Sequence, residues 1–404
     1  MPFSTKHNNF YIPHTLSVLM ACKICGKENC KQHTALLNKV RNMTEFSGSS
    51  PPEIFVGRWN YPNVYAGILS PPEYGNTALM SSAEHWHEQK LQIPDIVSLR
   101  DQLIYARKTT NVHTPQEPST TIMQEIAMTQ NSIAMEFKLE KPIAQNREHD
   151  NHVPLMSNAA PLVSVRLQEN TTIKPKVEYI VNDTTAKAKT ALLELEKNNI
   201  PTSTLMKLLS AGLLGEKNNR KLVPTRWSIT AVDDTLSKEK LEKIRFFSEI
   251  KTILVFHAEY LGNHYEFLLL PDKFAFEVLE FGMTSSGLWQ DYESFEGRTN
   301  YADSVTGAYY ANRLALTEYL EKMQRQAQCV VFREIRPEYN VPLGVGILRQ
   351  VSREAFTTHP ESFATIKEAI AQIQTRLRTP IIKFTEKSIL LKDFGKQTRL
   401  NKFF

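Results

Sequence analysis

The chain has 404 residues, of which 41% are hydrophobic and 23% are charged, and its formal net charge is +5. This length predicts two to three domains with cores of their own, and the weakly basic charge is compatible with nucleic-acid binding without requiring it. No run of 18 apolar residues occurs, and the N-terminal sequence MPFSTKHNNFYIPHTL has no apolar stretch. We therefore expect no membrane span, no secretory signal and a cytoplasmic location.

Four residues near the N-terminus have the spacing of a zinc knuckle. Cys22, Cys25, Cys30 and His33 form the pattern C-x2-C-x4-C-x2-H. Such thiolate and imidazole groups can complete a tetrahedral Zn²⁺ shell, and three cysteines with one histidine leave no open position for catalysis. The pattern predicts a structural zinc, with a metal-free or redox-active thiol cluster as the alternative. Cys329 lies in an apolar run and is expected to be a buried thiol.

The first half of the chain predicts both strands and helices. Residues 51–75 indicate two short strands around a turn at 60–62, and residues 95–108 have apolar side chains at helical spacing. Residues 109–120 are expected to form a polar linker. Residues 141–161 are rich in Pro, Asn and His without a period, which is typical of a long loop.

A pair of predicted helices and a basic loop come next. Residues 184–198 and 202–215 have helical patterns with a short turn between them. This order resembles a helix-turn-helix unit, although most helix pairs only pack against each other. Four basic residues of the following loop are candidate nucleic-acid contacts: Lys217, Arg220, Lys221 and Arg226.

Residues 227–232 predict a strand, and residues 235–250 predict a helix after it. Asp233 and Asp234 stand between these two elements. They could cap the helix, or they could bind Mg²⁺ or Mn²⁺ as part of a catalytic site.

Residues 252–270 predict a β-hairpin with a tight turn at Gly262–Asn263. This turn would pair Glu259 with Glu266, and two carboxylates directly opposite each other repel unless a cation lies between them. The charged face of the hairpin is therefore either a site for a divalent metal or a basic group, or a solvated face with ion pairs. One face is expected to be apolar (Phe256, Ala258, Tyr260, Tyr265, Phe267 and Leu269), and the other polar (His257, Glu259, His264 and Glu266). The candidate catalytic residues of a metal-dependent enzyme acting on nucleic acid or a nucleotide are Asp233, Asp234, His257, Glu259 and Glu266.

The rest of the chain predicts a smaller α+β domain. Residues 301–326 and 360–377 have helical patterns, and residues 328–336 and 343–351 are expected to be strands.

The last eight residues have the pattern Q-x-x-L-x-x-F-F, formed by Gln397, Leu400, Phe403 and Phe404. One helical turn would bring the three apolar side chains together as anchors for a groove, and aromatic anchors commonly dominate such binding. The pattern is typical of peptides that bind the DNA polymerase sliding clamp (PCNA). The preceding residues 392–396 are polar and basic with a glycine, as in a flexible tether. The alternative is an apolar end that folds back on its own domain.

Several longer segments resemble the archaeal Nre family of DNA-repair proteins. They are FVGRWNYPNVYAGILSPPEYG, SAGLLGEKNNRKLVPTRWSITAVDD, GAYYANRLALTEYLEK and FREIRPEY, together with the cysteine cluster and the terminal peptide. The resemblance covers nearly the whole chain in order. It implies an N-terminal and a C-terminal family domain, clamp binding and a role in DNA-damage repair. His33 departs from the fourth cysteine that is common in the family, and the resemblance transfers no catalytic residue.

These observations predict an α+β protein with four parts. They are an N-terminal segment 1–45 with a zinc knuckle at 22–33, a mixed α/β domain 46–290 with an antiparallel hairpin, an α+β domain 291–391, and a flexible tail 392–404. The expected function is a DNA-repair factor that binds the clamp and DNA and is associated with the nucleoid through the clamp. The alternatives are a metal-dependent enzyme and a non-catalytic adaptor.

Overall fold

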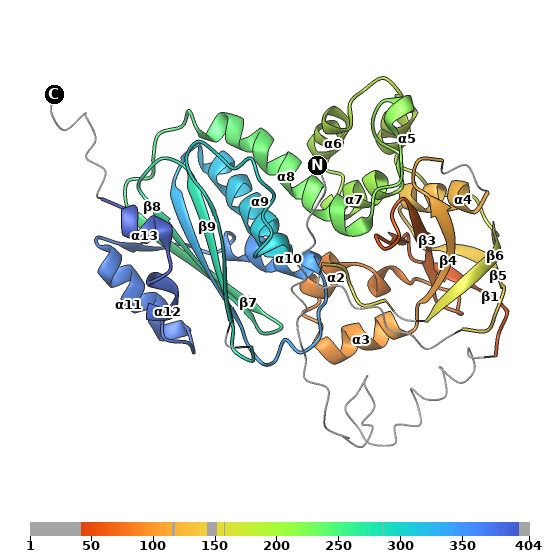
Figure 1. Cartoon of the computed structure of the whole chain (residues 1–404), viewed down its shortest axis with the longest axis horizontal. Coiled ribbons are helices and arrows are strands. Elements are labelled where there is room, and N and C mark those ends of the chain that lie inside the picture. The colour runs from red at the N-terminus through yellow and green to blue at the C-terminus, as the bar shows by residue number, and fades with distance from the viewer. Residues whose placement is uncertain (1–41, 115–117, 144–151, 157, 286, 396–404) are drawn as a thin grey trace, which may run out of the picture.

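The computed structural model describes residues 42–114, 118–143, 152–156, 158–285 and 287–395. The predicted zinc knuckle and clamp peptide lie outside these residues. The described chain contains two six-stranded sheets, which stand apart with the long helix α8 (Thr225–Ile244) running between the two halves (Figure 1). The predicted α+β class is confirmed. No described helix is long and apolar enough to cross a membrane.

The first sheet has the strand order β1-β5-β6-β4-β3-β2. Its neighbouring strands are antiparallel except for the parallel pair β4 and β6. Its strands are β1 (Glu45–Ser50), β2 (Ile54–Val56), β3 (Asn63–Ser70), β4 (Ile104–Asn111), β5 (Ile133–Leu139) and β6 (Ala159–Leu167). The helices of this half are η1 (Ala78–Met80), α2 (Ala83–Glu88), α3 (Ile93–Asp101), α4 (Pro118–Met128), α5 (Pro175–Asn182), α6 (Ala188–Lys197), α7 (Thr202–Ser210) and η2 (Lys217–Asn219).

The second sheet has the order β10-β9-β11-β8-β7-β12, and only β9 and β11 are parallel. Its strands are β7 (Ile253–Tyr260), β8 (Asn263–Leu270), β9 (Ala275–Gly282), β10 (Gly287–Glu293), β11 (Gln328–Ile335) and β12 (Glu361–Phe363). The helices that follow α8 are α9 (Thr306–Met323), α10 (Val345–Ala355), α11 (Ile366–Arg376), α12 (Ile382–Thr385) and α13 (Ile389–Asp393). Strands from both sides of residue 290 share this sheet.

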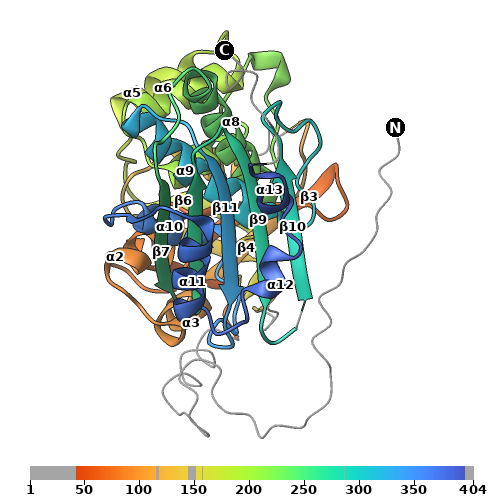
Figure 2. The ribbon, with the colours of Figure 1, turned by 90° about the vertical axis from the view of Figure 1, so that its left-hand side faces the viewer.

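Helices cover both faces of the second sheet. Along the central strand β11, Cys329 and Val331 pack with α8, α9 and α10, whereas Val330 and Phe332 pack with α11, α12 and α13. Figure 2 shows the latter three helices in front of the strands. A strand that is covered on both faces needs a continuous apolar run, and Cys329–Phe332 supplies it. The thiol of Cys329 is buried as predicted, and burial raises its pKa well above the usual range.

Helix α8 connects the two cores. Ile229, Val232 and Leu236 belong to the apolar cluster under the first sheet, and Leu241 and Ile244 belong to the cluster under the second. Residues 227–232, predicted as a strand, therefore lie within this helix. The helical spacing of the buried positions outweighs the β-branched composition of the segment.

Residues 343–351 were also predicted as a strand, and here too the helical spacing of the buried residues outweighs the β-branched composition. They begin α10, where Ile347, Leu348, Val351 and Ala355 form one buried stripe against the second sheet. The glycine before α10, Gly344, has φ 83°, a conformation that other residues adopt only with strain.

Three further predicted boundaries were wrong. The helix predicted over 95–108 ends at Asp101, and β4 occupies 104–111. The predicted linker 109–120 is thus divided between the end of β4 and the start of α4. The helix predicted over 360–377 begins at Ile366, because Thr365 and Glu368 form a capping box that fixes its start.

The predicted hairpin is present, but its register is shifted. Leu261 and Gly262, both with positive φ, form the turn, so that Glu259 pairs with His264 and not with Glu266. Asn263 lies in β8, where its buried carboxamide oxygen accepts a 2.5 Å hydrogen bond from Arg333. The shift preserves which side chains share a face, and the apolar face is confirmed as part of the core.

The helix-turn-helix prediction is not supported by the packing. Its second helix, α7, is buried at Leu205, Met206 and Leu208 in the core of the first half. A recognition helix must present a free face to a DNA groove, and α7 instead packs against α8, α4 and β2.

Candidate functional site

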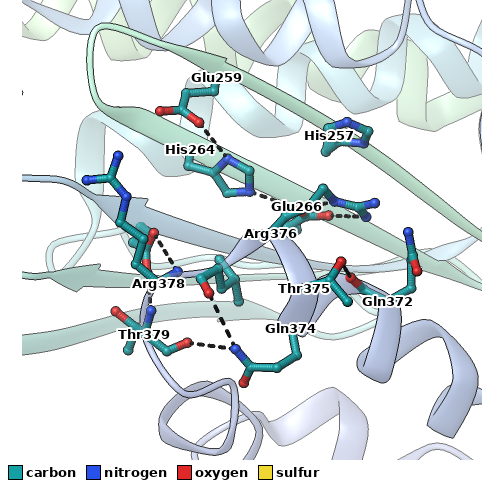
Figure 3. A network of polar contacts seen from close by, with 12 residues as sticks. His257, Glu259, His264, Glu266, Gln372, Gln374, Thr375, Arg376, Arg378 and Thr379 are labelled. Carbon is teal, nitrogen blue, oxygen red and sulfur yellow. Dashed lines mark hydrogen bonds and ion pairs between the residues drawn. The ribbon is translucent and has the colours of Figure 1, made fainter.

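The polar face of the hairpin carries a dense network of charged groups (Figure 3). His264 lies between two carboxylates: its Nδ1 is 3.2 Å from Glu259 Oε2, and its Nε2 is 2.8 Å from Glu266 Oε1. Arg376, the last residue of α11, donates from Nε and Nη2 to the two oxygens of Glu266 at 2.7 and 2.8 Å. Arg336 donates to Glu259.

These arginines answer the question that the sequence left open about this face. His264 lies between the two carboxylates, and each carboxylate has an arginine partner of its own, Arg336 for Glu259 and Arg376 for Glu266. Both oxygens of Glu266 are bonded, and this glutamate is fully buried. Among the described residues there is no cluster of three or more His, Cys, Asp or Glu side chains suited to a metal. This donor set does not fit a divalent cation, because arginine already occupies the oxygen atoms that a cation would need.

The network continues to the loop after α11. Glu334 accepts from Arg336 Nε at 2.9 Å, from the Thr379 amide at 2.6 Å and from the Arg378 amide at 3.3 Å. Burial alone would raise the pKa of Glu334, but these hydrogen bonds hold it below its usual value. The network therefore ties the C-terminal helices to the sheet.

The buried and exposed glutamates of the hairpin are expected to differ in their contribution to stability. Glu266→Gln should lower the free energy of unfolding by about 2–3 kcal/mol, because Arg376 loses a buried bidentate partner and keeps only Glu361. Glu259→Gln should cost less than about 1 kcal/mol, since its side chain is 41% exposed. Chemical denaturation of both variants measures the difference, and equal losses would contradict this account.

Asp233 and Asp234 lie in the middle of α8, so the expectation that they cap a helix was wrong. Asp233 is fully buried and forms a bidentate ion pair with Arg349, with Nε–Oδ1 at 2.9 Å and Nη2–Oδ2 at 2.7 Å. Burial raises the pKa of Asp233, and Arg349 opposes this shift. Asp234 is partly exposed and contacts Arg313 and Lys238.

The five candidate catalytic residues do not form one site. His257, Glu259 and Glu266 project from the face of the second sheet that α11 covers, whereas α8 with its two aspartates lies on the other face. The sheet separates the two groups. Sequence reasoning missed their arginine partners, which are distant in the chain: Arg336 and Glu259 are 77 residues apart, and Arg376 and Glu266 are 110 apart.

The four basic candidates have different environments. Arg220 is half-buried and donates to three carbonyl oxygens, those of Gly215, Val181 and Asp183, each at 2.8 Å. This side chain holds the loop to the end of α5. Lys217 and Lys221 are exposed, and Arg226 lies half-exposed in the first turn of α8.

A recess of about 720 Å³ lies beside the hairpin turn, between the turn and the start of α3. Its lining contains Glu259 and Glu338 and no lysine or arginine. Glu259 is ion-paired with Arg336, and Glu338 is ion-paired with Arg378. Such a lining gives no cationic group for a phosphate, so this recess does not suit the backbone of a nucleic acid.

Comparisons with known proteins agree over nearly the whole chain. Residues 16–290 match the family described as Archaeal Nre, N-terminal, and residues 293–403 match Archaeal Nre, C-terminal. DNA repair protein NreB of Archaeoglobus fulgidus is 33% identical over 388 residues, which cover 94% of this chain and 97% of the relative. DNA repair protein NreA of the same organism is 33% identical over 88% of this chain and 91% of the relative. DNA repair protein NreA of Haloferax volcanii is 30% identical over 85% and 86%. No solved structure matches the chain.

Proposed function

The chain belongs to the archaeal Nre family, and on this basis we propose that it is a DNA-repair factor that is recruited to DNA by the polymerase sliding clamp. The observation that supports the repair role is the similarity to three proteins named for DNA repair, each matched over at least 85% of this chain. Recruitment by the clamp is proposed from the pattern of Gln397, Leu400, Phe403 and Phe404. The C-terminal family match extends to residue 403 and so includes most of the predicted clamp peptide.

The described structure supports a short connection between the folded body and that peptide. Helix α13 is held to the second sheet by Glu277, a buried carboxylate of β9 that accepts from the Ser388 hydroxyl at 2.5 Å and from the Ile389 amide at 2.8 Å. Lys392 and Asp393, predicted as the start of the tail, still belong to α13. The predicted peptide begins at Gln397, two positions after Gly395, the last described residue, and two residues can span at most about 7 Å.

A short tether gives clamp recruitment a physical advantage. Once the peptide is bound, the body is confined within a small volume beside the DNA that passes through the clamp. The effective concentration of such a tethered module can reach the millimolar range. Weak intrinsic affinity for DNA is then sufficient for function.

Calorimetric titration of the full chain against the sliding clamp of the same organism tests the proposal. We expect saturable binding with one chain per clamp subunit. Gln397→Ala should weaken it by up to about tenfold, the magnitude of one neutral hydrogen bond. No heat of binding under conditions in which the clamp is an intact ring would contradict clamp recruitment.

We also propose that Cys22, Cys25, Cys30 and His33 hold one structural Zn²⁺, on the basis of their spacing. Elemental analysis of protein purified without added metal should find one zinc per chain, and Cys25→Ser should lose it. If His33→Ala keeps zinc while Cys30→Ser loses it, the fourth ligand lies elsewhere. A wild-type protein that is folded and free of zinc would contradict the proposal.

A further inference from the structure

Three segments that are far apart in the sequence lie side by side at one end of the first sheet. Strands β3 and β4 pair Asn63 with Asn111 and Tyr65 with Thr109. The Val56 amide donates to Thr225 Oγ1 at 3.0 Å, and the Leu222 amide donates to the Val112 carbonyl, also at 3.0 Å. Backbone hydrogen bonds thus join residues 57–66, 104–114 and 217–232. We call the following side chains of these segments the aromatic–basic surface: Arg58, Trp59, Tyr61, Tyr65, Arg107, His113, Arg226 and Trp227.

Four large aromatic side chains of this surface are exposed to solvent. The exposed fractions are 66% for Trp59, 40% for Tyr61, 46% for Tyr65 and 43% for Trp227. Aromatic side chains normally bury most of their area, and a cluster of exposed ones marks a binding surface more often than a lone exposed residue does. The packing of this half therefore leaves these rings available to a partner.

The rings are held by their neighbours. The Tyr61 ring lies 5.4 Å from that of Trp227 and 6.3 Å from that of His113. The guanidinium carbon of Arg58 is 4.1 Å from the centre of the Trp59 ring, and that of Arg107 is 4.1 Å from the centre of the Tyr65 ring. Each arginine thus places a positive charge beside an aromatic face.

The charged side chains of these segments are all cationic. Residues 57–66, 104–114 and 217–232 contain no Asp or Glu. Their cationic side chains are Arg58, Arg107, Lys108, Lys217, Arg220, Lys221 and Arg226. Arg58, Arg107 and Arg226 belong to the aromatic–basic surface, whereas Arg220 holds the loop. Segments whose charged side chains are all cationic are complementary to a phosphate backbone.

The backbone beneath the surface is firmly anchored. Val56, Val64 and Val112 are buried in the core of the first half. The Val112 amide donates to the Pro62 carbonyl at 3.0 Å, and the Gly57 amide donates to the Tyr65 carbonyl at 2.7 Å. A surface that is already in place loses little conformational entropy on binding.

We propose that the aromatic–basic surface binds unpaired DNA, with bases stacked on Trp59, Tyr61 and Trp227 and phosphates near Arg58, Arg107 and Arg226. Base stacking on aromatic rings beside a cationic groove is the common physical basis of single-strand binding. In duplex DNA the bases are already stacked on each other, so exposed rings would gain little. The inference rests on the proposed repair function, which is the reason for choosing DNA as the nucleic acid. Its new claim is that the protein binds single-stranded and not duplex DNA.

Fluorescence anisotropy of the full-length protein with a labelled oligothymidylate tests the proposal. We expect saturable binding that weakens by about 5- to 100-fold in Trp59→Ala and in Trp227→Ala, the magnitude of one lost stacked base. Trp59→Phe and Trp227→Phe should keep most of the affinity, which separates stacking from misfolding. Arg58→Gln should reduce the slope of log affinity against log salt by about 0.7.

Phe246→Ala is the matched control. Phe246 is 89% exposed and follows the C-terminal end of α8, a helix of 20 residues that begins beside the aromatic–basic surface. A helix of this length spans about 30 Å, so Phe246 is remote from the proposed site. Its removal should leave the affinity unchanged.

A second readout uses the protein's own fluorescence. The chain has four tryptophans, and stacked bases should quench Trp59 and Trp227. The quenching by oligothymidylate should fall in the two Phe variants and persist in Trp289→Phe, because Trp289 lies in β10 of the second sheet. Quenching that is lost only in Trp289→Phe would show that the oligothymidylate binds near Trp289 and not on the aromatic–basic surface.

Three results with nucleic acids would overturn the proposal. They are Trp59→Ala and Trp227→Ala variants that bind as wild type does, tighter binding to duplex than to single strand, and tighter binding to RNA than to DNA of the same sequence. Capture of the sliding clamp by the aromatic–basic surface would also contradict it, because that surface would then be a protein-binding site. Trp59→Ala should keep clamp binding, and Phe403→Ala should keep single-strand binding, so failure of one proposal is distinguishable from failure of the other.

Discussion

Replacing Phe403 and Phe404 together by alanine is expected to lower the affinity for the sliding clamp by about two to four orders of magnitude. Each phenylalanine side chain contributes about 1.5–3 kcal/mol when it is fully buried in an apolar pocket. With both removed, Leu400 is the remaining apolar anchor of the predicted peptide. Calorimetric titration of the double variant against the clamp measures the loss.

Phe394→Ala is a matched control for this experiment. Phe394 is the same residue type, follows α13 and packs with the apolar cluster under α11, α12 and α13. Its removal should loosen the end of the folded body but leave clamp affinity within about twofold of wild type, or about 0.4 kcal/mol, because Phe394 lies outside the predicted peptide at 397–404. Unchanged affinity in the double variant, or a comparable loss in the control, would show that the terminal peptide is not the docking element.

The second large effect concerns the ion pair between Asp233 and Arg349. Arg349→Met should lower the free energy of unfolding by about 3–5 kcal/mol, because it leaves a buried carboxylate without its partner. Both side chains are almost fully buried, and Arg349 also lies 3.7 Å from the sulfur of Met206. The double variant Asp233→Leu with Arg349→Met should recover most of the loss, since an apolar pair of similar volume has no charge to desolvate.

The pH dependence of Arg349→Met gives an independent check. Burial raises the pKa of Asp233, and removing the arginine removes the charge that opposes this shift. A carboxyl group with a raised pKa in the folded state binds protons more readily there than in the unfolded chain. The protonated carboxyl therefore contributes to stability at low pH. This contribution is lost as the pH rises from about 4, the ordinary pKa of aspartate, through the raised pKa of the folded state. Relative to wild type, the variant should be less destabilised at pH 5 than at pH 8; the opposite order would contradict the assignment.

The parts of the fold that the sequence predicted well are those with a strong local period. Strand β11 lies where the pattern placed it, and the hairpin, α6 and α9 lie within their predicted ranges, with α9 limited to Thr306–Met323. Two of the errors, at residues 227–232 and 343–351, share a cause, because β-branched composition and helical spacing disagree in both segments. Residues 227–232 contain Ile229 and Val232, which look strand-like by composition but bury one helical face against the first core. Tertiary packing decides such cases.

The register error in the hairpin has a different origin. Gly262–Asn263 is the more favourable dipeptide for a tight turn, yet the turn is formed by Leu261 and Gly262. Asn263 is retained in the strand by Arg333, which lies 70 residues away in the chain. No local pattern contains that information, and the same holds for the arginines that neutralise Glu259 and Glu266.

The aromatic–basic surface illustrates what could have been found from the sequence and what could not. The absence of acidic residues in each of its three segments is visible in the sequence. The contact between the rings of Tyr61 and Trp227, at 5.4 Å, is not visible in the sequence. It depends on the position of the start of α8 beside the loop between β2 and β3. The basic loop after α7 is visible in the sequence, but the role of Arg220 in holding that loop depends on its contacts in the folded chain.

The most direct test of the account is the affinity of the full chain for primed DNA with and without a loaded sliding clamp. We predict that the loaded clamp increases the affinity by at least about 100-fold, because two linked contacts act together. The gain should disappear when Phe403 and Phe404 are replaced by alanine, while the weaker binding to DNA alone remains. Equal affinities for DNA with and without the clamp would contradict the proposal that this protein is a clamp-recruited DNA-repair factor.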